Sequence, residues 1–204
     1  MKWFHFWFNA ALFSLIFCVP PRLTAQVATN YLSGRVIVKL LPDYLRPRVY
    51  ALNESTSTNA GTLLAMNAVD GSTIAEITVG TNPTDMAMSP AGDVLYVINA
   101  GSRTISKVNL GTFSVSAEKV ISTPYAANLA YPLHVAVGVS NLVYFTDGAL
   151  GPRVTLFDYQ NGTNIGIYSG TVGGMVLTHD CDTMYTFYQY GLALPRLCGQ
   201  SVSA

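Results

Sequence analysis

A short apolar run that carries one tyrosine recurs four times along this chain of 204 residues. The runs are residues 49–53, 95–99, 143–147 and 184–187, with Tyr50, Tyr96, Tyr144 and Tyr185 at the equivalent position. The tyrosines lie about 45 residues apart, and a period of about 40–50 residues is typical of repeated β-sheet units. The repeat therefore predicts an array of similar units that bury their apolar faces against one another.

Other elements recur in the same order around each tyrosine run. An apolar run precedes it, at residues 85–88, 134–137 and 174–177, and predicts an inner strand that its neighbours cover on both faces. A third run follows it, at residues 63–67, 105–109 and 154–158, and in the first unit Asp70 and Gly71 then favour a hairpin to an outer strand. The chain is thus predicted to be all-β, with four-stranded antiparallel sheets arranged as the blades of a β-propeller.

The stretch 79–99 carries the most complete copy of the repeat, including the run Tyr96-Val97-Ile98-Asn99. It resembles the repeat of YVTN-type β-propeller proteins, whose name comes from a Tyr-Val-Thr-Asn run. The resemblance is looser at 132–158 and implies a secreted or cell-surface protein, usually of seven blades and often without assigned chemistry. Because propellers host many unrelated activities, the resemblance bears on the fold rather than on the function.

The blade count predicts an incomplete ring. Residues 35–80, 81–122 and 131–169 supply three blades, and residues 170–204 supply the first strands of a fourth, which makes about three and a half. Closed propellers have about four to eight blades, and an open stack leaves edge strands that can pair with other chains. We therefore expect either a fragment of a longer product or self-association through the open blade edges.

The N-terminal residues 1–25 differ in character from the rest. Lys2 precedes an apolar run at 6–19, which Pro20, Pro21 and the small residue Ala25 follow. This order is typical of a signal-peptide helix, and the run is shorter than the roughly 20 residues of a membrane-spanning helix. We expect cleavage to leave residues 26–204 as a partial propeller with no integral membrane span, in a secreted, periplasmic or cell-surface location. An uncleaved anchor is the alternative.

Charge and cysteine content narrow the function classes further. The chain has 11 Lys+Arg and 11 Asp+Glu, and charged residues make up 11% of it, against about 25% in an average soluble domain. Scattered cations on a neutral chain do not build a nucleic-acid-binding surface. Outside residues 1–25 the cysteines are Cys181 and Cys198, which an oxidising compartment permits to form a disulfide; two separate buried thiols are the alternative.

Candidate site residues lie at the starts of the inner strands, where propellers usually bind ligands. Alignment of these strands places Asp85, His134 and Gly174 at one position. Asp85 and His134 are therefore the candidate ligand-binding residues, at the mouth of the central channel around which the blades of a propeller are arranged. The alternative is that each caps its strand against a neighbouring blade. Asn53, Asn99 and Asp147 recur three residues after the tyrosines, and we expect them to bond to the backbone of the following turn.

The sequence favours neither a metal nor a cofactor nor a catalytic set. One cluster carries side chains that can bind metals: His179, Asp180, Cys181 and Asp182. It lies where the other units have a turn, and it lacks the spacing of a calcium or zinc site. We therefore predict an exported, non-enzymatic propeller that binds protein or carbohydrate. The alternatives are a metal-dependent enzyme of the lactonase or hydrolase type, with Asp85 and His134 among the ligands, and a truncated remnant without function.

Overall fold

The computed structural model describes a chain built of β-strands and turns. The described residues are 32, 34–54, 59–121, 132–140, 142–147, 153–168, 174–178, 183–188 and 191–197. The predicted signal peptide, the pair Cys181 and Cys198 and the polar cluster at 179–182 lie outside them. In the described part, no helix has the length and apolar character needed to cross a membrane.

The strands form four antiparallel sheets, each a meander of consecutive strands. The first contains β1 (Ile37–Pro42), β2 (Arg48–Asn53), β3 (Ala60–Asn67) and β4 (Thr73–Thr81). The second contains β5 (Pro83–Met88), β6 (Val94–Asn99), β7 (Thr104–Asn109) and β8 (Ser114–Val120). The third contains β9 (Pro132–Val137), β10 (Leu142–Asp147), β11 (Val154–Asp158) and β12 (Thr163–Tyr168). The fourth contains β13 (Gly174–Leu177), β14 (Thr183–Tyr188) and β15 (Gly191–Leu197).

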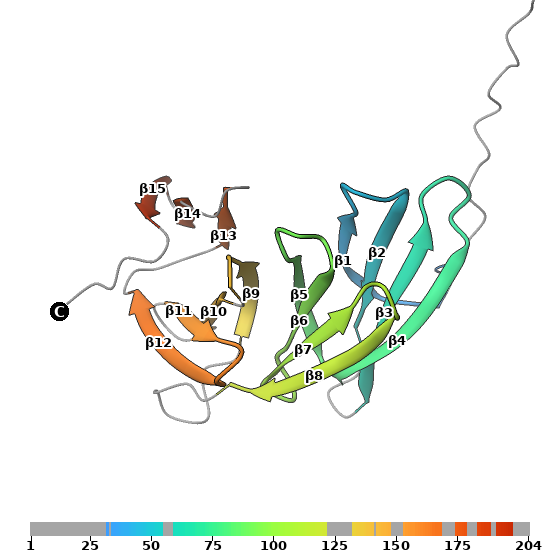
Figure 1. Cartoon of the computed structure of the whole chain (residues 1–204), viewed down its shortest axis with the longest axis horizontal. Coiled ribbons are helices and arrows are strands. Elements are labelled where there is room, and N and C mark those ends of the chain that lie inside the picture. Colours follow the sequence, from blue (N-terminus) through green and yellow to red (C-terminus); the bar gives the residue numbers. More distant parts are fainter. Residues whose placement is uncertain are drawn as a thin grey trace, which may run out of the picture.

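This arrangement confirms the predicted all-β class and the incomplete propeller of four-stranded antiparallel sheets. The sheets follow one another along an arc that is open on one side (Figure 1). Strands β1, β5, β9 and β13 lie toward the inside of the arc, and β4, β8 and β12 lie along its outside. The first strand of each sheet is therefore the inner strand of a blade.

Apolar side chains fill the space between neighbouring sheets. Tyr50 of the first sheet shares a cluster with Met86 of the second, Tyr96 shares one with Val135 of the third, and Tyr144 shares one with Met175 of the fourth. These three tyrosines are at most 2% exposed. The recurring tyrosine is thus the residue that packs each blade against the next one.

Aromatic rings reinforce the contact between the second and third sheets. The ring centroids of Tyr96 and Tyr159 are 5.0 Å apart in an edge-to-face arrangement, and Phe157 packs edge-on against both Phe145 and Tyr159. The Tyr159 hydroxyl lies 2.9 Å from the carbonyl oxygen of Ala117 in the second sheet. Burial raises the pKa of Tyr159, so its hydroxyl remains a donor across the neutral range.

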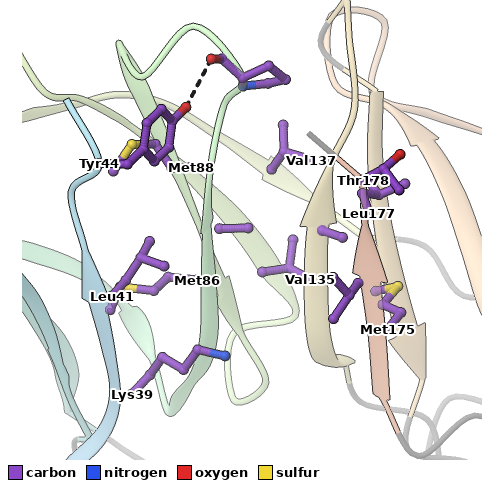
Figure 2. Close-up of a pocket in the computed structure, with 14 residues that line it drawn as sticks. Lys39, Leu41, Tyr44, Met86, Met88, Val135, Val137, Met175, Leu177 and Thr178 are labelled. Atoms are coloured by element: carbon purple, nitrogen blue, oxygen red, sulfur yellow. Dashed lines mark hydrogen bonds between the residues drawn. The ribbon is translucent and has the colours of Figure 1, made fainter. Parts of the chain in front are cut away.

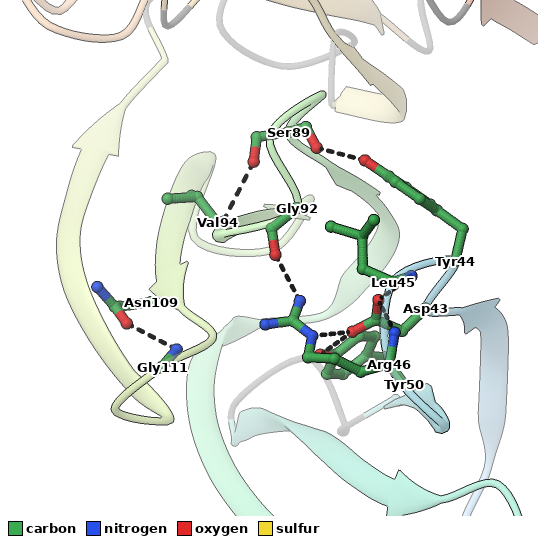
Figure 3. Close-up of polar contacts among 10 residues, drawn as sticks. All are labelled: Asp43, Tyr44, Leu45, Arg46, Tyr50, Ser89, Gly92, Val94, Asn109 and Gly111. Carbon is green, nitrogen blue, oxygen red and sulfur yellow. Dashed lines mark hydrogen bonds and ion pairs between the residues drawn. The ribbon is translucent and has the colours of Figure 1, made fainter.

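A polar cluster holds the loop after β1 against the next blade (Figure 3). The buried Asp43 carboxylate accepts hydrogen bonds from the Leu45 amide (2.9 Å), from Arg46 Nε (2.6 Å) and from the Tyr50 hydroxyl (2.9 Å). Arg46 also donates to the carbonyl of Gly92 in the β5–β6 turn. Burial alone would raise the pKa of Asp43, but these donors together lower it. The loop of one blade is therefore anchored on the turn of the next.

The recurring amide after the tyrosine makes bonds across the sheet. The side-chain oxygen Oδ1 of Asn53 accepts a bond from the Val36 amide (2.9 Å), and Asn99 Nδ2 donates to Thr104 Oγ1 (3.1 Å) and Ser106 Oγ (2.9 Å) on the neighbouring strand. These contacts tie Asn53 to the residue before β1 and Asn99 to β7, whereas most of the turn after Asn53 lies outside the described residues. The side chain of Asp147 lies outside the described set.

Candidate functional site

The four inner strands bring one repeated position together on the inside of the arc. In each sheet, this position pairs with the residue two places after the recurring tyrosine. The pairs are Lys39 with Leu52, Asp85 with Ile98, His134 with Thr146, and Gly174 with Phe187. Sequence alignment had placed Asp85, His134 and Gly174 in equivalent positions, and the register adds Lys39 from β1.

Asp85 is the centre of this group and makes contacts to three blades. Lys39 Nζ lies 2.9 Å from Oδ1, which also accepts a bond from the Met86 amide at 2.9 Å. The other oxygen, Oδ2, accepts a bond from the Val135 amide at 3.1 Å and lies 3.6 Å from His134 Nδ1. Both candidate residues from the sequence therefore meet, and the neighbour that sequence reasoning missed is the lysine.

The electrostatics of the group favour an ionised carboxylate. Asp85 is 5% exposed, and burial alone would raise its pKa. The contacts with His134 and Lys39 and the Val135 amide outweigh burial, so the pKa of Asp85 lies below its ordinary value. Asp85 is thus an anion at neutral pH, while the side chains of Lys39 and His134 are each 42% exposed to solvent.

This arrangement fits a structural contact that links neighbouring blades better than it fits a metal site. A carboxylate offers about four acceptor positions, and nitrogen groups approach Asp85 at four places. A cation shared by Asp85 and His134 would have to compete with the Val135 amide at Oδ2, and the Lys39 ammonium, 2.9 Å from Oδ1, would repel it. Within the described residues, no group of three or more His, Cys, Asp or Glu side chains could hold a metal ion.

Beside this group, the inner strands line a cavity of about 400 Å³. The apolar side chains that line it come from all four sheets: Leu41, Met86, Ala87, Met88, Val135, Ala136, Val137, Met175, Val176 and Leu177. Lys39 lies at one end of the cavity, and Tyr44 and Thr178 lie at the other (Figure 2). The cavity is therefore an apolar pocket with polar groups at its two ends.

No sequence signal distinguishes the wall of a pocket from a buried strand. The runs 85–88, 134–137 and 174–177 are apolar, and that pattern predicted strands covered on both faces. In the structure Met86, Val135 and Met175 are indeed buried, at 9% exposure or less, yet they also border the cavity. Which apolar residues line a pocket depends on how the blades are spaced around the axis.

Comparison with known proteins supports the fold. No protein-family model and no curated protein matches this sequence. Among solved structures, hydrazine synthase of Kuenenia stuttgartiensis, which contains a β-propeller, is similar with a TM-score of 0.59 and 17% sequence identity. The similarity covers 78% of this chain and 43% of the other, so the chain spans less than half of that protein. At this identity the likeness shows a propeller-like fold and no activity.

Proposed function

We propose that this protein is an exported, non-enzymatic binding module that takes an apolar segment of a protein partner into its central pocket. The observation that supports this proposal is the cavity of about 400 Å³, to which all four inner strands contribute apolar side chains. Concave, mostly apolar cavities with a few polar groups at their margins are the usual form of a ligand site. Export rests on the signal-peptide pattern at residues 1–25.

The lining favours an apolar peptide side chain over a carbohydrate. A sugar presents hydroxyl groups, and each one that loses water needs a new hydrogen-bond partner. Most lining residues, such as Met88 and Leu177, cannot supply one. Thioethers, as in Met86, Met88 and Met175, adapt their shape to different apolar groups, which is common at surfaces that bind protein segments.

A dye-binding experiment tests the pocket. We expect the purified protein to bind 8-anilinonaphthalene-1-sulfonate, and we expect Met88→Glu to weaken this binding by about tenfold or more, because a carboxylate would then lie in the apolar cavity. Fluorescence titration measures the effect. Ile167→Glu, at a 41% exposed position on β12, is the matched control and should bind the dye as the wild type does.

Competition separates the two ligand classes. Short apolar peptides should displace the dye from the wild type, and neutral oligosaccharides should leave it bound. Dye binding that survives Met88→Glu unchanged would refute the pocket as the binding site. Displacement by an oligosaccharide alone would instead assign a carbohydrate ligand.

The meeting of Asp85 and His134 keeps a metal-dependent hydrolase as the second candidate. Because Lys39 and two backbone amides already surround the carboxylate, we expect millimolar calcium or zinc to leave the thermal unfolding midpoint unchanged. Calorimetry of the apo protein with each ion measures this. A metal bound at 100 times its dissociation constant would stabilise the fold by about 2.7 kcal/mol. Two results together would favour the enzyme: a metal that stabilises the wild-type fold by this amount but not the Asp85→Asn variant, and turnover of a lactone by the wild type.

A further inference from the structure

The recurring tyrosine is covered in three blades and uncovered in the fourth. Tyr50, Tyr96 and Tyr144 are 0%, 2% and 1% exposed, because the next sheet packs over each of them. Tyr185, at the same register position on β14, is 40% exposed, and its register partner Val176 is 53% exposed. No described sheet lies over this outward face of the fourth blade. The end of the arc therefore presents the face that elsewhere receives a blade.

The opposite end of the arc presents the complementary face. Met86, Val135 and Met175 occupy one register position on the inner strands, and each packs with the tyrosine of the preceding sheet. They are 2%, 6% and 9% exposed. The equivalent residue of the first sheet is Leu40, which pairs with Ala51 and is 56% exposed.

This first face is open near the axis and covered farther out. Leu32 and Ile37 pack on Ala51, Leu64 and Met66, which are at most 8% exposed. Val38 and Leu40 on β1 remain 39% and 56% exposed. The uncovered part of the first face is thus the inner strand, which in the other blades receives the tyrosine.

We infer that a second copy of this chain covers both faces. In each copy, the face of the fourth sheet that carries Tyr185 would pack on the face of the first sheet that carries Leu40 in the other copy. Each chain carries both halves of the contact that joins its own blades, and a second copy offers them in the same geometry. Two arcs joined head to tail at both ends would close a ring of eight sheets, which lies within the known range of about four to eight blades. The pocket between the inner strands would then lie on the axis of this ring.

The test is the mass of the purified protein in solution by light scattering. The wild type should show twice the mass of one chain and fall to a single-chain mass on dilution. Leu40→Glu and Tyr185→Glu should each weaken dimerisation by about tenfold or more, since either change places a carboxylate at both junctions. Val120→Glu, at a 72% exposed position on β8, is the control and should remain dimeric.

Mixing the two variants tests the head-to-tail arrangement. In a mixed dimer one junction carries both substitutions and the other carries none, so an equal mixture should recover dimers that neither variant forms alone. A wild type that stays monomeric at high concentration would overturn the inference, and further blades of a longer chain would then be the partner of these faces. A mixture that recovers no dimer, or a Val120→Glu variant that dissociates like the others, would overturn it as well. Circular dichroism verifies that each variant is folded.

Discussion

Replacing Asp85 with alanine should lower the free energy of unfolding by about 2–3 kcal/mol, because the change leaves backbone amides of two blades without their acceptor. The Met86 and Val135 amides both donate to this carboxylate, and Asp85 is 5% exposed. Urea unfolding followed by circular dichroism measures the loss. A decrease below about 0.5 kcal/mol, typical of a surface substitution, would contradict the role of Asp85 as a joint between blades.

The matched variant Lys39→Ala separates the ion pair from the backbone bonds. Lys39 is 42% exposed, and an ion pair with a solvent-exposed partner contributes about 1 kcal/mol or less. We therefore expect Lys39→Ala to cost clearly less than Asp85→Ala. Equal losses would mean that the lysine, rather than the two amides, carries the stabilisation.

The pH dependence of this difference follows from the pKa of Asp85. The folded pKa lies below the ordinary value of 3.8, so the ionised carboxylate stabilises the fold above that value. The contribution is lost as the pH falls from about 4 through the lower folded pKa. The difference between wild type and Asp85→Ala should therefore be constant near neutral pH and shrink in acid.

The sequence predicted the local strands because each has its own signal. The run 95–99 became β6 (Val94–Asn99), and the run 85–88 became the end of β5 (Pro83–Met88). The order of strand and turn residues is a local property of the sequence, and a repeat of about 40–50 residues shows the same order several times. The fold class followed from the repeat together with the strand and turn signals inside each unit.

The contacts between blades could not be predicted in the same way. Lys39 and Asp85 are distant in sequence, and nothing in the sequence around Lys39 indicates that it lies next to Asp85. The cluster of Asp43 and Arg46 carries no sequence motif for a related reason, since it forms only where the loop after β1 meets the β5–β6 turn. Both groups depend on how two blades are placed side by side, which is a tertiary property.

The pocket is the clearest case of this limit. An apolar inner strand has the same sequence pattern whether its neighbours touch it on all sides or leave a space beside it. The candidate residues Asp85 and His134 do not line the pocket, although Asp85 pairs with Lys39 at one end of it, and the lining residues Met88 and Leu177 carried no distinguishing signal. Neither the polar residues at the ends of the pocket, Lys39, Tyr44 and Thr178, nor the volume between them could be predicted from the sequence.

Tyr96→Ala should produce the largest loss of stability, about 3–5 kcal/mol, because it opens a cavity between two blades. Tyr96 is 2% exposed, lies in the apolar cluster that joins the second and third sheets, and packs edge-on against Tyr159. Thermal or urea unfolding of the variant measures the loss. A loss near 1 kcal/mol would show that the tyrosine does not hold the blades together.

Tyr185→Ala is the matched control, because it removes the same side chain from the same register position. Tyr185 is 40% exposed, so in a monomer its replacement should cost only about 1 kcal/mol. The comparison is made at a protein concentration where light scattering shows single chains. Since a following blade covers Tyr96 and no described sheet covers Tyr185, most of the difference between the two losses is expected to come from the contact between one blade and the next. Equal losses would mean that the strand itself, rather than the neighbouring sheet, determines the value of the tyrosine, and the stacking of blades would no longer account for the repeat.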